Sequence, residues 1–168
     1  MTILETTNLH SGRLSTMVRI SLLSLALFLV SFASPAMAQT ITTTQVLSFG
    51  TIAIDNLNDN VRLNIRNNGG CNPNGNTFVI DPCSRGEFLL TGGPANSVYT
   101  VTTPATINLT GPGPNVFFVD NFRVRPNTLI TNASGTDTFR IMARLNSTLG
   151  QNFGDGTFND TFNITVNF

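Results

Sequence analysis

The last twelve residues of the chain, Thr157 to Phe168, alternate between polar and apolar side chains, with Asp160 as the one exception. Successive side chains of a β-strand point to opposite faces, so this pattern predicts a strand with one apolar face and one hydroxyl and amide face. Because the alternation continues to the final residue, the first question about function is which segment pairs with this strand. The apolar set consists of Phe158, Phe162, Ile164, Val166 and Phe168.

Residues 1–38 have the features of a secretory signal peptide. A short basic region at residues 17–19 precedes an apolar run from Ile20 to Phe32, and Ala36 and Ala38 occupy the small-residue positions of a cleavage site. The apolar run is too short to span a bilayer. We expect translation to begin at Met17 and residues 39–168 to form one exported domain without a membrane anchor.

The composition of residues 39–168 indicates an all-β fold and excludes several functions. Thr and Asn occur twenty times each and Phe eleven times, which favours strands and turns. Seven Arg and eight acidic residues leave the domain near neutral, so we expect no nucleic-acid partner. The absence of His in this segment excludes Ser-His-Asp catalysis and His-based zinc binding. We therefore expect neither an enzyme nor a cofactor.

Nine strand-like runs, separated by turns rich in Gly, Pro and Asn, predict an immunoglobulin-like β-sandwich of two sheets. The sequence leaves open whether this sandwich is complete or lacks its last strand. The runs are residues 46–54, 61–66, 77–80, 87–91, 98–102, 106–109, 116–124, 138–146 and 157–168.

Cys71 and Cys83 are the only cysteines of the chain. In an exported protein, two cysteines at this separation are expected to form a disulfide. A redox function is the alternative, but the sequence has neither a C-x-x-C motif nor a nearby Lys or His that would lower a thiol pKa. A structural disulfide is therefore the preferred interpretation.

Acidic residues offer two further alternatives. A glycosidase needs two carboxylates, and the candidate pairs are Asp155 with Asp160 and Asp120 with Glu87. Their spacing carries no signal, so surface carboxylates are preferred. The loop at residues 55–60 offers oxygen ligands for calcium, but an apolar residue stands at a ligand position, so an Asx-rich turn is preferred.

Arginines alternate with apolar residues in two of the expected strands. Arg62 and Arg66 alternate with Leu63 and Ile65, and Arg140 and Arg144 follow the same pattern less regularly. These arginines are interpreted as residues of a solvated face rather than as ligand contacts.

Three segments resemble motifs of secreted bacterial domains related to spore-coat-U proteins and archaic chaperone–usher pilins. Residues 47–52 resemble their opening L-x-F-G-x-I strand, and residues 87–92 with 98–104 resemble their F-x-V-T-G … Y-x-I-x-x-P segment. Residues 156–168 resemble their closing strand. The likeness covers most of residues 39–168, and it lies in the order and spacing of the motifs.

This resemblance implies a fimbrial-type subunit that assembles by β-strand complementation. In such pilins a periplasmic chaperone, and then a like subunit, supplies a missing strand. The implied location is the periplasm, cell surface or fimbrium of a Gram-negative bacterium. Residues 39–45 depart from the pattern, since Ile41 is the only large apolar residue of the expected donor segment. The residues expected to face the strand-accepting groove are Phe162, Ile164, Val166 and Phe168.

The alternative function is a self-complete binding module for glycans or surface polymers. Such a module needs exposed aromatic rings, and the candidates are Phe117, Phe118 and Tyr99. The consecutive Phe117 and Phe118 place one ring away from the core in a regular strand, unless a bulge or a covering loop intervenes.

Overall fold

The computed structural model describes residues 38–55, 60–74, 77–148, 153 and 155–168 of the chain. Over these ranges the chain forms eleven β-strands and no helix, so the prediction of an all-β, sandwich-like fold is confirmed. The expected signal peptide lies outside the described residues, apart from Ala38. In the part of the chain that is described, no helix has the length and apolar character needed to cross a membrane.

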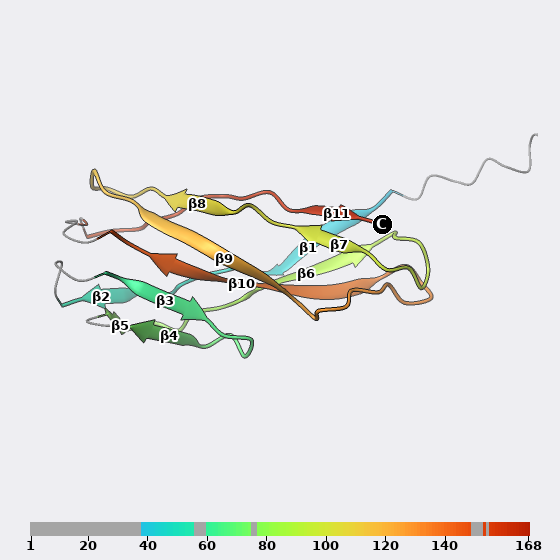
Figure 1. Cartoon of the computed structure of the whole chain (residues 1–168), viewed down its shortest axis with the longest axis horizontal. Coiled ribbons are helices and arrows are strands. Elements are labelled where there is room, and N and C mark those ends of the chain that lie inside the picture. Colours follow the sequence, from blue (N-terminus) through green and yellow to red (C-terminus); the bar gives the residue numbers. More distant parts are fainter. Residues whose placement is uncertain (1–37, 56–59, 75–76, 149–152, 154) are drawn as a thin grey trace, which may run out of the picture. The chain divides into compact units, whose positions relative to one another are not determined.

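The strands are short except for β9 and β10, the two longest (Figure 1). In chain order they are β1 (Thr40–Gln45), β2 (Ile52–Ile54), β3 (Arg62–Ile65), β4 (Cys71–Asn74), β5 (Thr77–Val79), β6 (Gly86–Thr91), β7 (Thr100–Thr102), β8 (Thr106–Leu109), β9 (Phe117–Arg125), β10 (Asp137–Asn146) and β11 (Thr165–Asn167).

β10 is the central strand of the largest sheet. Its first half, Asp137–Ile141, pairs antiparallel with β6, and its second half, Arg144–Asn146, pairs with β3. β9 pairs with β10 along the opposite edge. β1, β4 and β8 add to β6, β3 and β9 respectively, which completes a sheet of seven strands.

The N-terminal segment forms one border of this arrangement. β2 and β5 make a separate antiparallel pair, and a single bridge between Ser48 and Ser84 lies between that pair and the β1–β6 pairing. Residues 40–54 therefore run antiparallel along residues 77–91.

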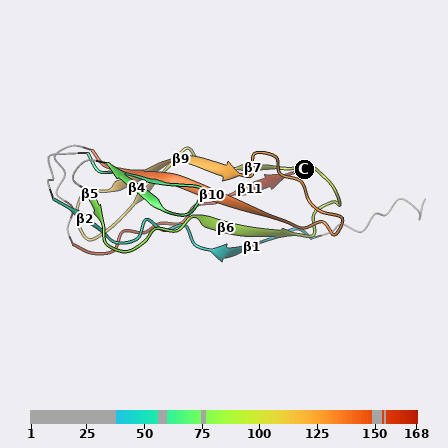
Figure 2. The same cartoon turned by 90° about the horizontal axis from the view of Figure 1, so that it is seen from below.

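The C-terminal segment forms the other border. Residues 98–110, which include β7 and β8, lie between β9 and the C-terminal segment. On one side they pair with β9 through the β8–β9 ladder and with Ile130 through the Val98–Ile130 bridge. On the other side they pair with the C-terminal segment through the Thr110–Asn159 bridge and the β7–β11 ladder. Figure 2 shows β1 and β6 on one side of β10, with β7 and β11 on the other.

A bulge in β9 reverses the face on which its apolar residues lie. The β9–β10 register shifts between Met142 and Arg144, and Asn121 adopts a positive φ of 51° at this point. Asn tolerates the left-handed region better than most residues, and an extra residue in one strand inverts the alternation that follows. Before the bulge the odd-numbered residues Phe117 and Val119 of β9 are buried, whereas after the bulge the even-numbered Phe122 packs against the core.

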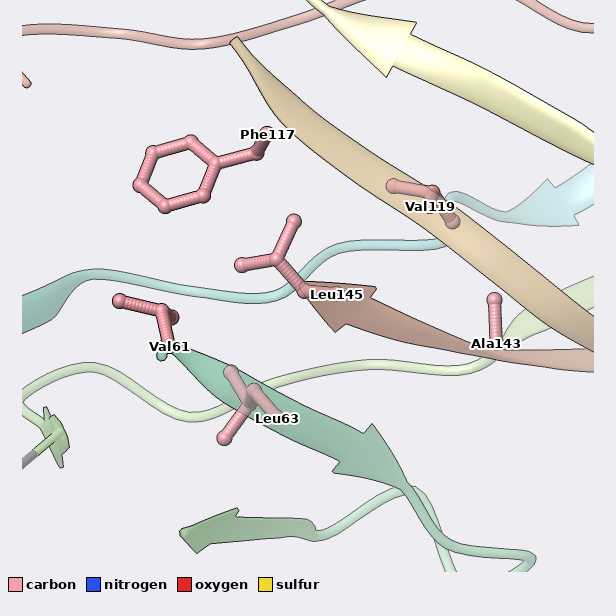
Figure 3. Close-up of a cluster of buried hydrophobic side chains, with 6 residues drawn as sticks. All are labelled: Val61, Leu63, Phe117, Val119, Ala143 and Leu145. Carbon is pink, nitrogen blue, oxygen red and sulfur yellow. The ribbon is translucent and has the colours of Figure 1, made fainter. Parts of the chain in front are cut away.

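Two clusters of buried side chains form the core, and we call the sheet faces that carry them the inner faces. Figure 3 shows the first cluster, whose side chains lie side by side on the neighbouring strands β9 and β10 and on β3 with the residue before it. The first cluster consists of Val61, Leu63, Phe117, Val119, Ala143 and Leu145. The second cluster consists of Phe88, Leu90, Tyr99, Leu129, Phe139 and Ile141.

Each of the nine expected segments overlaps a strand, but the structure corrects the expectations in two ways. β1 and β4 were not expected as strands: all six β1 residues are exposed, and β4 contains Pro73, so neither shows an alternating pattern. The final strand is also shorter than the expected residues 157–168. Continuing the β7–β11 register would place Asn163 opposite Pro104, which has no N–H to donate to a ladder.

Candidate functional site

The C-terminal segment places its apolar side chains on the inner face, as the alternation predicts. Phe162, Ile164 and Val166 are half-buried and pack against the second cluster, whereas Thr161, Asn163, Thr165 and Asn167 are exposed. We call Phe162, Ile164, Val166 and Phe168 the C-terminal row.

Phe168 is the most exposed member of the C-terminal row. Its side chain is 44% exposed, although its ring lies 5.5 Å from the buried ring of Tyr99. The ring also lies beside Gly93, where an added Cβ would clash with it. Phe168 thus contacts the core from its border without being enclosed by it.

β11 lies at the edge of its two-stranded sheet. Val166 pairs with Val101 of β7, and among the described residues no strand pairs with the opposite edge of β11. Farther back, the Asn159 amide donates to the Thr110 carbonyl oxygen at 3.1 Å. Residues 160–164 between these two contacts have no ladder partner in the part of the chain that is described.

The burial of inward-facing side chains falls from the centre of the structure to this border. Phe139 and Ile141 of the central strand are 0% exposed, whereas the inward-facing residues of β11 and of the segment before it are only half-buried. Side chains at a sheet edge lack the neighbours that a further strand would supply.

β1 forms the other border and contributes little to either cluster. All six of its residues are exposed, and Ile41 is its only large apolar side chain. β1 is therefore held mainly by its main-chain pairing with β6. One signal for this strand is present in the sequence, since Ile and four Thr are β-branched residues that favour extended backbone.

The predicted disulfide between Cys71 and Cys83 is confirmed. It joins β4 to the segment between β5 and β6, with a Cα–Cα distance of 5.7 Å. Both residues are half-buried and pack against the first cluster. The bond links the β3–β4 hairpin to the strand that continues into β6.

Two of the candidate glycosidase carboxylates form ion pairs with arginines. Asp120 accepts hydrogen bonds from Arg144, and Glu87 is paired with Arg85 and Arg140. The hydrogen bond from Arg144 holds the pKa of Asp120 below its usual value, against a smaller opposing effect of burial. A carboxylate held in its ionised form is suited to an ion pair rather than to proton donation.

The structure offers no candidate metal site within the described residues, where no group of three or more His, Cys, Asp and Glu gathers. Residues 56–59 of the candidate calcium loop at residues 55–60 lie outside the described residues.

The aromatic candidates for a glycan platform are not exposed. Phe117 is 4% exposed and Tyr99 is 3% exposed, and Phe118 is half-buried. The Tyr99 hydroxyl donates to Asp137 Oδ2 at 2.9 Å, and burial followed by this hydrogen bond raises the pKa of Tyr99. These two rings act in the core, so they cannot stack on a sugar.

Comparisons with known proteins identify a family but no function. A family model described as "Domain of unknown function (DUF4402)" matches residues 40–168. No curated protein matches the chain, and no solved structure matches it. The likeness to spore-coat-U proteins and pilins therefore stays a prediction from the sequence motifs.

Proposed function

The chain belongs to the DUF4402 family of domains of unknown function, and from its border strands we propose a structural, fimbrial-type role at the cell surface. In this proposal the domain assembles with like subunits by β-strand complementation. The half-buried C-terminal row at the edge of β11 carries the proposal.

The edge of β11 has what strand addition requires. An edge strand presents unpaired N–H and C=O groups, and an added strand gains main-chain hydrogen bonds there. Phe162, Ile164 and Val166 are half-buried, so an incoming strand would remove more of their apolar surface from water. Main-chain pairing would supply affinity, and the spaces between alternate side chains would supply specificity.

β1 supports the same proposal from the opposite border. A strand with six exposed residues can leave its partner β6 without uncovering its own core side chains. Detachment then costs mainly the β1–β6 main-chain pairing, which an equivalent pairing with another subunit would replace. A periplasmic chaperone is the expected partner before assembly, because an open edge invites aggregation.

The remaining features fit an exported structural protein. A disulfide is compatible with an oxidising compartment outside the cytoplasm. The near-neutral charge of residues 39–168 favours packing of copies against one another, because little repulsion separates them.

Phe168 allows a test that separates assembly from folding. Because this side chain is 44% exposed, Phe168→Ser should cost the isolated domain little stability while removing a residue that an added strand would cover. We expect the exported variant to lose assembly in size-exclusion chromatography with light scattering, with an unchanged circular dichroism spectrum.

Val98→Ser is the matched control, since Val98 is an exposed apolar residue outside the C-terminal row. The control should assemble like the unmodified chain. Equal assembly of the Phe168→Ser variant and the control, or export of the unmodified chain as a stable monomer without any chaperone, would contradict the proposal.

A further inference from the structure

We propose that the outer face of the domain carries a binding site for carboxylate-bearing sugars, where β3, β4, β9 and β10 meet. A pocket of about 320 Å³ opens there, lined by three arginines, three asparagines and Met142 among others. This volume lies at the lower end of the range for small-molecule sites, about 300–1,000 Å³. The proposal does not rest on strand exchange, because neither β1 nor the C-terminal row lines this pocket.

Met142 and Ile65 are the two buried apolar residues that line this pocket. Ile141 and Ala143, the neighbours of Met142, face the core, so Met142 points to the outer face, yet it is only 4% exposed. Arg123 of β9 pairs with Met142, and the β10–β3 register, continued from Arg144–Asn64, places Arg66 on its other side. The aliphatic stems of arginines can cover such a residue while their charged ends stay in water.

No acidic side chain that the structure describes forms an ion pair with the arginines of this pocket. Among the described residues, ion pairs join Arg85 and Arg140 to Glu87 and Arg144 to Asp120, and none involves the three arginines of the pocket. These three bond to amide oxygens instead. Arg66 Nη2 donates to Asn72 Oδ1 at 2.7 Å, Arg123 Nε to Asn121 Oδ1 at 3.4 Å, and Arg125 Nη1 to Asn127 Oδ1.

Three like charges on one pocket repel one another, and an anion between them would remove that repulsion. Arg125 also lies opposite Arg140 in the β9–β10 register, but Glu87 is paired with Arg140, so the unbalanced charges are the three arginines of the pocket. A guanidinium group is planar and can hold a carboxylate through two parallel hydrogen bonds. The pocket is therefore suited to an anionic group rather than to an apolar ligand.

The asparagines favour a sugar over other anionic ligands, because they can bind its hydroxyl groups. Asn64, Asn67 and Asn72 line the pocket, and an amide side chain both donates and accepts hydrogen bonds, as hydroxyl groups require. No aromatic ring is among the described residues that line the pocket, so neither a nucleic-acid base nor a sugar ring can stack here, and a ligand would be held by the arginines and asparagines alone. A uronate sugar combines the carboxylate and the hydroxyl groups that these side chains can bind.

The test uses an oligomer of galacturonic acid, with the neutral galactose oligomer as the comparison probe. Binding to the exported protein is measured by calorimetry at low and at physiological salt. We expect the acidic oligomer alone to bind, more weakly at higher salt. Arg66→Gln and Arg123→Gln should each lower the affinity about ten-fold or more, which corresponds to the loss of a charge-assisted hydrogen bond.

Arg62→Gln is the matched control, because Arg62 is an exposed arginine of β3 that does not line the pocket. It removes the same charge and should lower the affinity by less than about two-fold. Arg123→Lys keeps the charge but loses the planar fork, so its affinity should be intermediate. If Arg123→Gln does not fold, the affinity of Arg123→Lys tests the role of this position instead.

Four results would overturn the proposal. They are no binding of the galacturonate oligomer, equal binding of the neutral oligomer, a loss in Arg62→Gln as large as in the pocket variants, and tighter binding of a DNA oligonucleotide at the same arginines. The last result would assign the pocket to a phosphate-bearing polymer. Phe168→Ser should leave galacturonate binding unchanged, so failure of the strand-exchange proposal and failure of this one are distinguishable.

Discussion

Arg144 and Asp120 form a bidentate ion pair between β10 and β9. Arg144 Nε donates to Asp120 Oδ1 and Nη2 donates to Oδ2, both at 2.8 Å. Asn146 Nδ2 donates to the same carboxylate at 2.8 Å. The pair fastens the two longest strands together beside the bulge at Asn121, where the main-chain ladder is interrupted.

This ion pair predicts a loss of stability in acid. The hydrogen bond from Arg144 lowers the pKa of folded Asp120 below its ordinary value of 3.8. The stabilisation is therefore complete above about pH 4 and is lost as the pH falls through the folded pKa. Asp120→Asn should cost about 1–2 kcal/mol at neutral pH, since the pair is partly solvated.

The measurement is the free energy of unfolding by urea, determined from neutral pH down to about pH 2. The unmodified chain should lose more stability over this range than Asp120→Asn, so the two curves should converge in acid. Parallel curves would contradict a lowered pKa for Asp120.

Removal of the disulfide should destabilise the domain. Replacement of both Cys71 and Cys83 by Ala opens a loop whose closure contributes about 3 kcal/mol in the chain-entropy model. Thermal unfolding with and without reductant measures this: reductant should lower the melting temperature of the unmodified chain and leave that of the double variant unchanged. Equal melting temperatures for both proteins in oxidising buffer would contradict the prediction.

The difference in burial between the centre and the border predicts unequal effects of ring removal. Phe139→Ala deletes a ring that is 0% exposed and stacked on Phe88 at 5.3 Å between centroids, so it should cost about 3–5 kcal/mol. Phe162→Ala deletes a half-buried ring and should cost roughly half as much. Urea unfolding of both variants gives the comparison, and equal losses would mean that the C-terminal row is enclosed in solution.

Alanine substitution at two glycines with positive φ would distinguish the cost of backbone strain from the cost of steric overlap. Gly135 has φ +70° and Gly69 has φ +87°. A Cβ at Gly135 would clash with the Gly93 carbonyl oxygen, whereas no atom of the described residues lies within 4 Å of a Cβ at Gly69. Gly69→Ala should cost about 1 kcal/mol from its backbone conformation, and Gly135→Ala clearly more. Similar losses in both variants would show that the loop around Gly135 rearranges freely.

The alternation at residues 157–168 predicted which side chains face the core, because side-chain direction depends only on extended backbone. It did not predict the length of the strand, since hydrogen bonding depends on the partner, and Pro104 interrupts that partner. β1 was not predicted because a strand with every residue exposed has no alternation to read.

The outer pocket also lay beyond prediction from the sequence. Arg66 and Arg123 flank Met142 only because β3 and β9 pair with opposite edges of β10. The bulge at Asn121 further determines which β9 side chains point outward. Strand neighbours and bulges of this kind arise from contacts between distant segments, which a local pattern does not encode.

Amide hydrogen exchange at residues 160–168 tests the proposed strand addition most directly. In the free domain the amides of residues 160–164 should exchange rapidly, because these residues have no ladder partner among the described residues, and the β11 amides that bond to β7 should exchange more slowly. In the assembled or chaperone-bound protein their exchange should slow markedly, while that of β10 stays unchanged. Exchange at residues 160–168 that is equally fast in the free and the bound protein would contradict the account.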